Sequence, residues 1–251
     1  MIIISGCSWS CGEWSRGDTR EDKTPYTVLH EGLTQYIKDV GITVLNLGIP
    51  AGSNYVVAKK ISSWFERNPD HQVKQIFIFQ TDYARDYQMR FDEDFDNIEY
   101  ANTVAHIMIA RFYHRLIEIS NKYNVKIYLI GGVSDTLSPE ILKSYYAPLE
   151  VACQSMVNLL VNKNHLIDDP VLSWYPGEYL PMVERIKKRL SADQISKLLQ
   201  EIDKGFNREN LVFSAPEYFW PDGIHPNRDG HKKLFDYLVE NNYLESPNNL
   251  T

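Results

Sequence analysis

The run Ile76-Phe77-Ile78-Phe79 is apolar at every position, so a strand formed by it is buried on both of its faces. Such strands are typical of parallel sheets, which are covered by helices on both sides. Apolar runs at 2–4, 42–45 and 125–130 share this character. Stretches with apolar residues at helical spacing separate the four runs. This alternation indicates βαβ units, and hence an α/β fold with a central parallel sheet between two layers of helices.

The remaining elements follow from the same periodicity and from capping signals. We expect helices at 24–38, from about 55, at 100–122, at 140–162 and at 229–241, and a short fifth strand at 166–167. Ser53 or Asn54 is the candidate N-cap of the second of these helices. Residues 176–208 are charged and have a helical pattern over 180–204, which we interpret as a helical insertion within a single domain covering 1–251.

The composition excludes several classes of protein. The chain has 251 residues, 43% of them hydrophobic and 24% charged, which is typical of globular domains. A net charge of −7 argues against broad binding to nucleic acid or anionic membranes. No apolar run approaches the roughly 20 residues of a membrane span, and the opening apolar run is too short for a signal peptide. Three cysteines make no disulfide framework, so we expect a cytoplasmic protein.

Three segments rich in glycine and polar residues lie where a parallel sheet places its ligands, outside the carboxyl ends of the strands. They cover residues 6–13, 46–54 and 222–231. Together they contain what acyl transfer from an ester requires. The hydroxyl of Ser8 is a poor nucleophile until a base such as His225 removes its proton, and a carboxylate such as Asp222 orients the imidazole. The backbone N–H groups of Ser8 and Gly52 are candidate donors to the oxyanion.

At these residues the sequence resembles the GDSL, or SGNH, hydrolase family. The family's first block, G-D-S-L-T-x-G, corresponds to Gly6-Cys7-Ser8-Trp9-Ser10-Cys11-Gly12, and its last block, D-x-x-H followed by P-N-x-x-G-H, is matched from Asp222 to His231. The resemblance implies a flavodoxin-like three-layer α/β/α fold. It also implies a serine esterase that needs no metal or other cofactor, with Ser8 as nucleophile, His225 as base and Asp222 as its partner.

The family's third block, G-x-N-D, is not reproduced. Here the strand continues into Gln80-Thr81-Asp82-Tyr83-Ala84-Arg85-Asp86, and Asp82 falls near the family's oxyanion asparagine. An ionised carboxylate cannot donate a hydrogen bond, so we assign no oxyanion role to Asp82. Our hypothesis is that the amide of Asn54 supplies the missing donor. Thr81 and Arg85 are candidate substrate contacts, although Arg85 could equally pair with a neighbouring aspartate.

Simpler readings compete with these assignments. Ser8 alone could be an N-cap, and Cys7 and Cys11 lack the spacing and partners of a zinc site. The acidic stretch 92–103 departs from a calcium loop at its sixth and twelfth positions.

The sequence favours an esterase or O-deacetylase acting on a small-molecule or carbohydrate ester. An O-acyltransferase, or a non-catalytic binding protein on the same fold, remains the alternative, and the oligomeric state is open.

Overall fold

The fold is described from a computed structural model that covers the whole chain. The structure describes residues 1–14, 28–81, 85–86, 98–132, 135–161, 216–219 and 225–244. For residues 98–105, 161 and 216 it describes the backbone only. The predicted strand at 166–167 and the predicted insertion at 176–208 lie outside these ranges, so the domain prediction stays a prediction.

Five parallel strands form the central sheet. They are β1 (Ile2–Gly6), β4 (Val44–Asn46), β5 (Gln75–Gln80), β6 (Lys126–Gly131) and β7 (Glu150–Cys153). Their spatial order is β4-β1-β5-β6-β7, and every adjacent pair is parallel. In chain order this is 2-1-3-4-5, the order of flavodoxin-like doubly wound sheets. The predicted fold class is confirmed.

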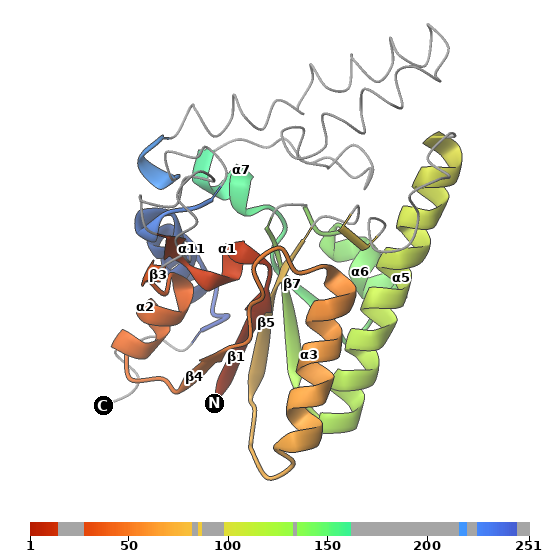
Figure 1. Ribbon diagram of the computed structural model, residues 1–251, viewed down its shortest axis with the longest axis horizontal. Helices are drawn as coiled ribbons and strands as arrows, with labels where there is room; N and C mark the ends of the chain where they lie inside the picture. The colour runs from red at the N-terminus through yellow and green to blue at the C-terminus, as the bar shows by residue number, and fades with distance from the viewer. Residues whose placement is uncertain are drawn as a thin grey trace, which may run out of the picture.

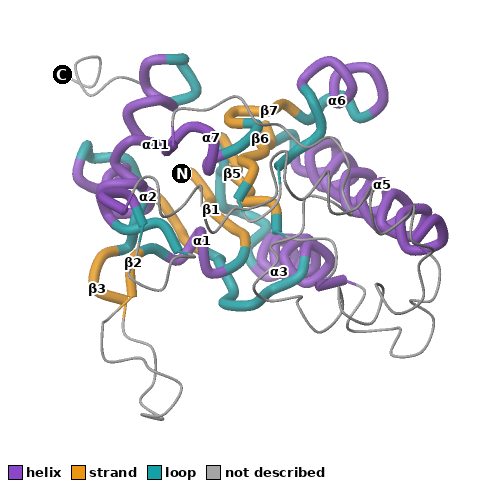
Figure 2. The backbone as a smooth tube through the Cα atoms, turned by 90° about the horizontal axis from the view of Figure 1, so that it is seen from above, coloured by secondary structure: helices purple, strands orange, loops and turns teal. Residues whose placement is uncertain are grey.

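Alternate residues of β5 enter two separate hydrophobic cores, which explains why the run at 76–79 is apolar at every position. Ile76 and Ile78 lie in one core, whereas Phe77 and Phe79 lie in the other. The first core is covered by α3 (Asn54–Arg67), α5 (Ile98–Tyr123) and α6 (Pro139–Tyr145). The second is covered by α2 (Leu33–Asp39), α7 (Met156–Val161) and α11 (Arg228–Glu240). Figure 2 shows these two helical layers on opposite sides of the sheet.

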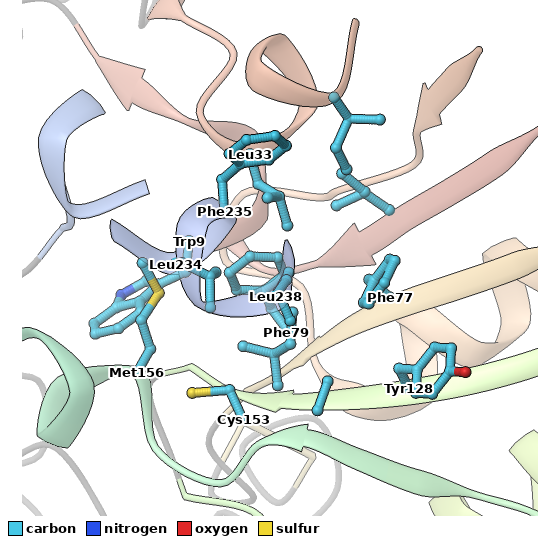
Figure 3. Packing of buried hydrophobic residues seen from close by; sticks show 14 of the residues in the cluster. Trp9, Leu33, Phe77, Phe79, Tyr128, Cys153, Met156, Leu234, Phe235 and Leu238 are labelled. Carbon is cyan, nitrogen blue, oxygen red and sulfur yellow. The ribbon is translucent and has the colours of Figure 1, made fainter. Parts of the chain in front are cut away.

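The second core includes a tryptophan from the segment that follows β1. Trp9 is 2% exposed and lies with Met156 and Leu234 in the cluster drawn in Figure 3. A buried aromatic side chain of this size removes a large apolar surface from water, which stabilises the fold. Trp9 therefore anchors the short helix that carries Ser8.

Two sequence predictions need correction. The helix predicted at 140–162 is three elements, because α6 ends at Tyr145, β7 follows and α7 begins at Met156. Pro148 lies between α6 and β7, and a helix cannot continue through it because proline has no backbone N–H and its ring clashes with the preceding turn. In the region predicted as a helix at 24–38, residues 28–30 form β3 (Val28–His30), which pairs antiparallel with β2 (Glu13–Trp14), and α2 begins only at Leu33.

The carboxyl edge of the sheet is where the connections diverge. After β1 the chain passes to β4, and after β4 it crosses to β5 on the other side of β1. Ligands of open α/β sheets bind at such a switch point. Helix α1 (Ser8–Cys11) lies at this end of β1, as Figure 1 shows, and α3 begins at the same edge. None of the helices within the described ranges combines the length and the hydropathy that crossing a bilayer requires.

Candidate active site

Ser8 stands at the first position of α1, directly beyond β1. The preceding residue, Cys7, is the N-cap and makes no side-chain capping hydrogen bond. Ser8 is 8% exposed. The turn into α1 depends on Gly6, whose φ is +148° and whose added Cβ would lie 2.7 Å from the Phe79 carbonyl oxygen on β5. Only glycine fits this close approach. The reading of Ser8 as an N-cap is therefore wrong, because Cys7 takes that position.

The imidazole of His225 reaches Ser8 across the switch point. Nε2 of His225 lies 2.8 Å from Oγ of Ser8, within hydrogen-bond distance, although 217 positions separate the two residues. The His225 ring is half-buried. The next residue, Pro226, forms an isolated bridge with Phe219, and Asn227 caps α11 by accepting the Gly230 N–H at 3.0 Å. These contacts fix the turn that presents His225. Asp222 lies outside the described residues, so its role stays a prediction.

Asn46 braces the helix that carries Ser8. Its Nδ2 donates to the Ser10 carbonyl oxygen at 2.6 Å and to Thr34 Oγ1 at 2.8 Å, while its Oδ1 accepts the Gly48 N–H at 2.8 Å. One side chain at the end of β4 thus ties together α1, α2 and the following loop. The amide supplies both donors and an acceptor, which explains an asparagine at this position.

The two predicted oxyanion donors beyond Ser8 already have partners. The Gly52 N–H donates to the Ile49 carbonyl oxygen at 2.8 Å, within a turn. Asn54 is 1% exposed, its Nδ2 donates to the Thr81 carbonyl oxygen at 2.9 Å, and its Oδ1 accepts the Thr81 N–H at 3.0 Å. This reciprocal pair joins the start of α3 to the end of β5. The oxyanion roles of Gly52 and Asn54 stay predictions, and each would require the group to share or release a partner.

Asp86 is a buried carboxylate that the sequence suggested only as a possible partner of Arg85. It is 6% exposed, and its Oδ1 accepts the Tyr55 N–H at 3.0 Å in the first turn of α3. Burial raises the pKa of Asp86, whereas hydrogen bonds from Tyr55, Ser53 and Asn54 counteract that rise. A carboxylate at a helix N-terminus is favourable to the helix dipole. Asp86 therefore completes the capping of α3.

Thr81 and Arg85, the predicted substrate contacts, lie on either side of the undescribed residues 82–84. Thr81 is fully buried, and its backbone is held by Asn54. Arg85 is half-buried next to Asp86. The substrate roles of both residues stay predictions.

Two of the cysteines, Cys11 and Cys153, have thiol pKa values above their ordinary value. Burial, with a smaller contribution from Cys7, raises the pKa of Cys11 to about 11, and burial raises that of Cys153 to about 12. A thiol with so high a pKa is a poor nucleophile near neutral pH. In the described part of the chain, no three histidine, cysteine or acidic residues are grouped as metal ligands would be.

Comparisons with known proteins gave fold-level likenesses only. No protein-family model and no curated protein matches the chain. Solved structures that it resembles include a psychrotrophic esterase from Pseudoalteromonas sp., with 13% identity over 98% of each chain and a TM-score of 0.42. A member of the lipolytic protein G-D-S-L family from Veillonella parvula DSM 2008 has 12% identity over 95% of this chain and 96% of its own, with a TM-score of 0.41.

A third resembling structure is an alpha/beta hydrolase enzyme from the metagenome of Lake Arreo, Spain. It has 10% identity over 95% of this chain and 93% of its own, and a TM-score of 0.38. Because identities and TM-scores this low carry no argument about activity, the function has to be argued from the geometry of the site.

Proposed function

We propose that this protein is a serine ester hydrolase of the SGNH type, which acts through an acyl-enzyme on Ser8. The observation that carries the proposal is the 2.8 Å approach of His225 Nε2 to Ser8 Oγ at the carboxyl edge of the sheet. A serine activated by a neighbouring imidazole is the recurring arrangement for acyl transfer. The likeness of the first and last sequence blocks to SGNH hydrolases supports the same assignment.

The reaction begins with proton transfer between these two side chains. His225 Nε2 accepts the proton of Ser8 as Oγ attacks the ester carbonyl carbon. The carbonyl oxygen becomes an oxyanion, to which the Ser8 N–H donates, since the first N–H groups of a helix have no partner within it. The carboxylate of Asp222 is assigned to His225 Nδ1–H, where it would stabilise the imidazolium.

The second half of the reaction regenerates the enzyme. The imidazolium of His225 gives its proton to the leaving alcohol as the carbon–oxygen bond breaks, which leaves the acyl group on Ser8. His225 then removes a proton from water, and the hydroxide attacks the acyl carbon. The bond between that carbon and Ser8 Oγ breaks as the imidazolium returns its proton to Oγ, and the carboxylic acid departs. We assign the substrate to the class of small acyl esters, with O-acetylated carbohydrates as the first class to assay.

A covalent probe and a chromogenic ester test this proposal together. We expect the protein to hydrolyse p-nitrophenyl acetate and to react with a fluorophosphonate, with mass spectrometry locating the adduct on Ser8. Ser10 provides the control within the same helix, because its Oγ donates to the Cys7 carbonyl oxygen at 2.8 Å. Ser10→Ala should still be labelled and Ser8→Ala should not. Equal hydrolysis by the wild type and Ser8→Ala would instead support a non-catalytic binding protein.

A further inference from the structure

Glu13 joins the segment that carries Ser8 to the helix that follows His225. It lies two residues after α1, and its partner is Arg228, the first residue of α11. Glu13 Oε2 accepts hydrogen bonds from the Arg228 backbone N–H at 2.8 Å and from Arg228 Nε at 2.8 Å, and Oε1 accepts one from Nη2 at 3.1 Å. The carboxylate thus holds both the backbone and the side chain of a residue three positions from His225.

The two ends of this contact differ in exposure. The side chain of Glu13 is 12% exposed, whereas that of Arg228 is 50% exposed. Exposed ion pairs contribute little, so the guanidinium is the weaker part of the contact. The bond from the Arg228 backbone N–H satisfies a donor in the first turn of α11 that has no partner within the helix. A carboxylate in this place is also favourable to the helix dipole.

The charge state of Glu13 suits this role. Burial acts to raise its pKa, but the hydrogen bonds and the positive charge of Arg228 outweigh burial and lower the pKa below its ordinary value. Glu13 is therefore ionised at neutral pH, and it accepts charge-assisted hydrogen bonds, which are stronger than neutral ones.

We propose that Glu13 is a positioning residue for the Ser8–His225 pair, which it aligns by holding the start of α11 against the segment that follows α1. Two contacts then connect the segment after β1 to the segment before and at the start of α11. One joins the reacting side chains of Ser8 and His225, and the other joins Glu13 to Arg228. A misplacement of about 1 Å in a catalytic group can lower a rate on the order of 10²-fold. The inference rests on the proposed function.

The test compares kcat and KM for p-nitrophenyl acetate among Glu13 and Arg228 variants of the full chain, at a temperature where circular dichroism shows each to be folded. Glu13→Ala should lower kcat by about 10- to 100-fold with KM unchanged within about twofold. Glu13→Gln keeps a neutral acceptor and should stay within about fivefold of the wild type. Arg228→Ala keeps the backbone donor and should lose less than Glu13→Ala.

A double variant and a control complete the design. Glu13→Ala combined with Arg228→Ala should be no slower than Glu13→Ala alone, because the two residues act as one contact. Asp236→Ala removes the exposed ion pair with Lys232 on the same helix and should leave kcat within about twofold. The rate of fluorophosphonate labelling of Ser8 should fall in parallel with kcat.

The failure of this inference is distinguishable from failure of the proposed function. If Ser8→Ala abolishes hydrolysis while Glu13→Ala keeps the wild-type kcat and only unfolds more easily, Glu13 is a stabilising residue and the inference is overturned. If Glu13→Ala does not fold, Glu13→Asp takes its place, because the shorter side chain keeps the charge but cannot reach both the backbone and the side chain of Arg228. Wild-type kcat in a folded Glu13→Asp then overturns the inference. If Ser8→Ala is as active as the wild type, the proposed function itself is wrong.

Discussion

Two strand-to-helix junctions at the same edge of the sheet use serine in opposite ways. At the junction of β4 and α3, Ser53 is the N-cap and accepts the Val56 N–H at 3.4 Å. At the junction of β1 and α1, Ser8 makes no capping bond, and its Oγ lies 2.8 Å from a ring nitrogen of His225. At the junction of β4 and α3 the serine serves the local backbone, whereas at the junction of β1 and α1 the partner of the serine comes from the far end of the chain. The difference separates a structural serine from a candidate nucleophile.

The ionisable groups buried beside these junctions differ in the same way. Asp86, beside Ser53, accepts hydrogen bonds from the start of α3. His231, in α11, packs against the segment around Gly32, and neither of its ring nitrogens has a hydrogen-bond partner among the described residues. The buried carboxylate beside the α3 junction is therefore hydrogen-bonded, whereas the buried imidazole in α11 is not.

Exchanging each serine for alanine gives the largest expected effect. Ser8→Ala should lower kcat by on the order of 10³-fold or more, with little change in the free energy of unfolding. Ser53→Ala should do the reverse, costing about 1 kcal/mol of stability as the loss of an N-cap, with kcat within about threefold. Ester hydrolysis and urea unfolding measure the two quantities. A large loss of kcat in Ser53→Ala would remove the contrast between the junctions.

The Asn54→Ala variant tests whether the junction of β4 and α3 is purely structural. The substitution breaks the reciprocal pair with Thr81 and leaves buried backbone groups unpaired, so we expect a loss of about 2–4 kcal/mol in the free energy of unfolding. At a temperature where the variant is folded, kcat should fall by less than about tenfold, whereas removal of an oxyanion donor costs on the order of 10²–10³-fold. A loss in that larger range would restore Asn54 to the oxyanion hole.

How far the sequence predicts these two junctions follows from how local their interactions are. The cap of α3 and the strand β5 depend on neighbouring residues. The pattern predicted Ser53 or Asn54 as the cap and a strand at 76–79, and the structure has Ser53 as the cap and a strand over Gln75–Gln80. The pairing of Ser8 with His225 was predicted from the chemistry of acyl transfer together with the resemblance of the first and last sequence blocks to the SGNH family. The contact between Glu13 and Arg228 was missed, although both residues lie in the polar segments 6–13 and 222–231. It forms through tertiary packing, and the sequence blocks leave the residue types at these two positions unspecified.

The short edge strand β7 shows a second limit. The segment 140–162 has apolar residues at helical spacing on both sides of the strand, so periodicity alone extended one helix through it. Pro148 was the signal that could have divided it. Carboxylates commonly cap helix N-termini, so a capping role for Asp86 was a possible prediction. The sequence did not indicate which helix Asp86 caps, because 31 positions separate it from Tyr55.

The pH dependence of stability tests the contrast between the buried groups. Burial, with a smaller contribution from the nearby charge of His30, lowers the pKa of His231 from 6.5 to about 3. The folded state therefore binds this proton less readily than the unfolded state, so stability is retained above about pH 6.5 and falls as the pH decreases toward 3. At pH 5 the loss is on the order of 2 kcal/mol. Urea unfolding at pH 7 and pH 5 measures it.

His231→Leu is the matched variant, because leucine fills a similar space and does not titrate. Its unfolding free energy should decrease less between pH 7 and pH 5 than that of the wild type, while the exposed His106→Gln should behave like the wild type. Asp86 has a raised pKa and contributes the opposite slope, which is present in every protein compared and cancels in the difference. Equal slopes for the wild type and His231→Leu would show that His231 is not the group responsible.

The smallest expected effect concerns the turn that leads into α3. Ala51 has a φ of +56°, and the turn closes where the Gly52 N–H meets the Ile49 carbonyl oxygen, with Pro50 ahead of Ala51 as in a type II turn. A left-handed conformation costs a non-glycine residue about 1–2 kcal/mol, which a glycine at this position would avoid. Glycine also increases the conformational entropy of the unfolded chain, which offsets part of this stabilisation. Ala51→Gly should therefore stabilise the protein by roughly 0.5 kcal/mol.

The neighbouring Gly52→Ala substitution should have the opposite sign. Its added Cβ would lie 2.8 Å from the Ile49 carbonyl oxygen, so the turn has to shift and the free energy of unfolding should decrease. Urea unfolding of the pair measures both effects, and kcat of Ala51→Gly should stay within about twofold of the wild type, because strain released in a structural junction leaves the Ser8–His225 geometry unchanged. A destabilised Ala51→Gly, or one with a much altered kcat, would mean that this turn shapes the site and that the two junctions are not independent.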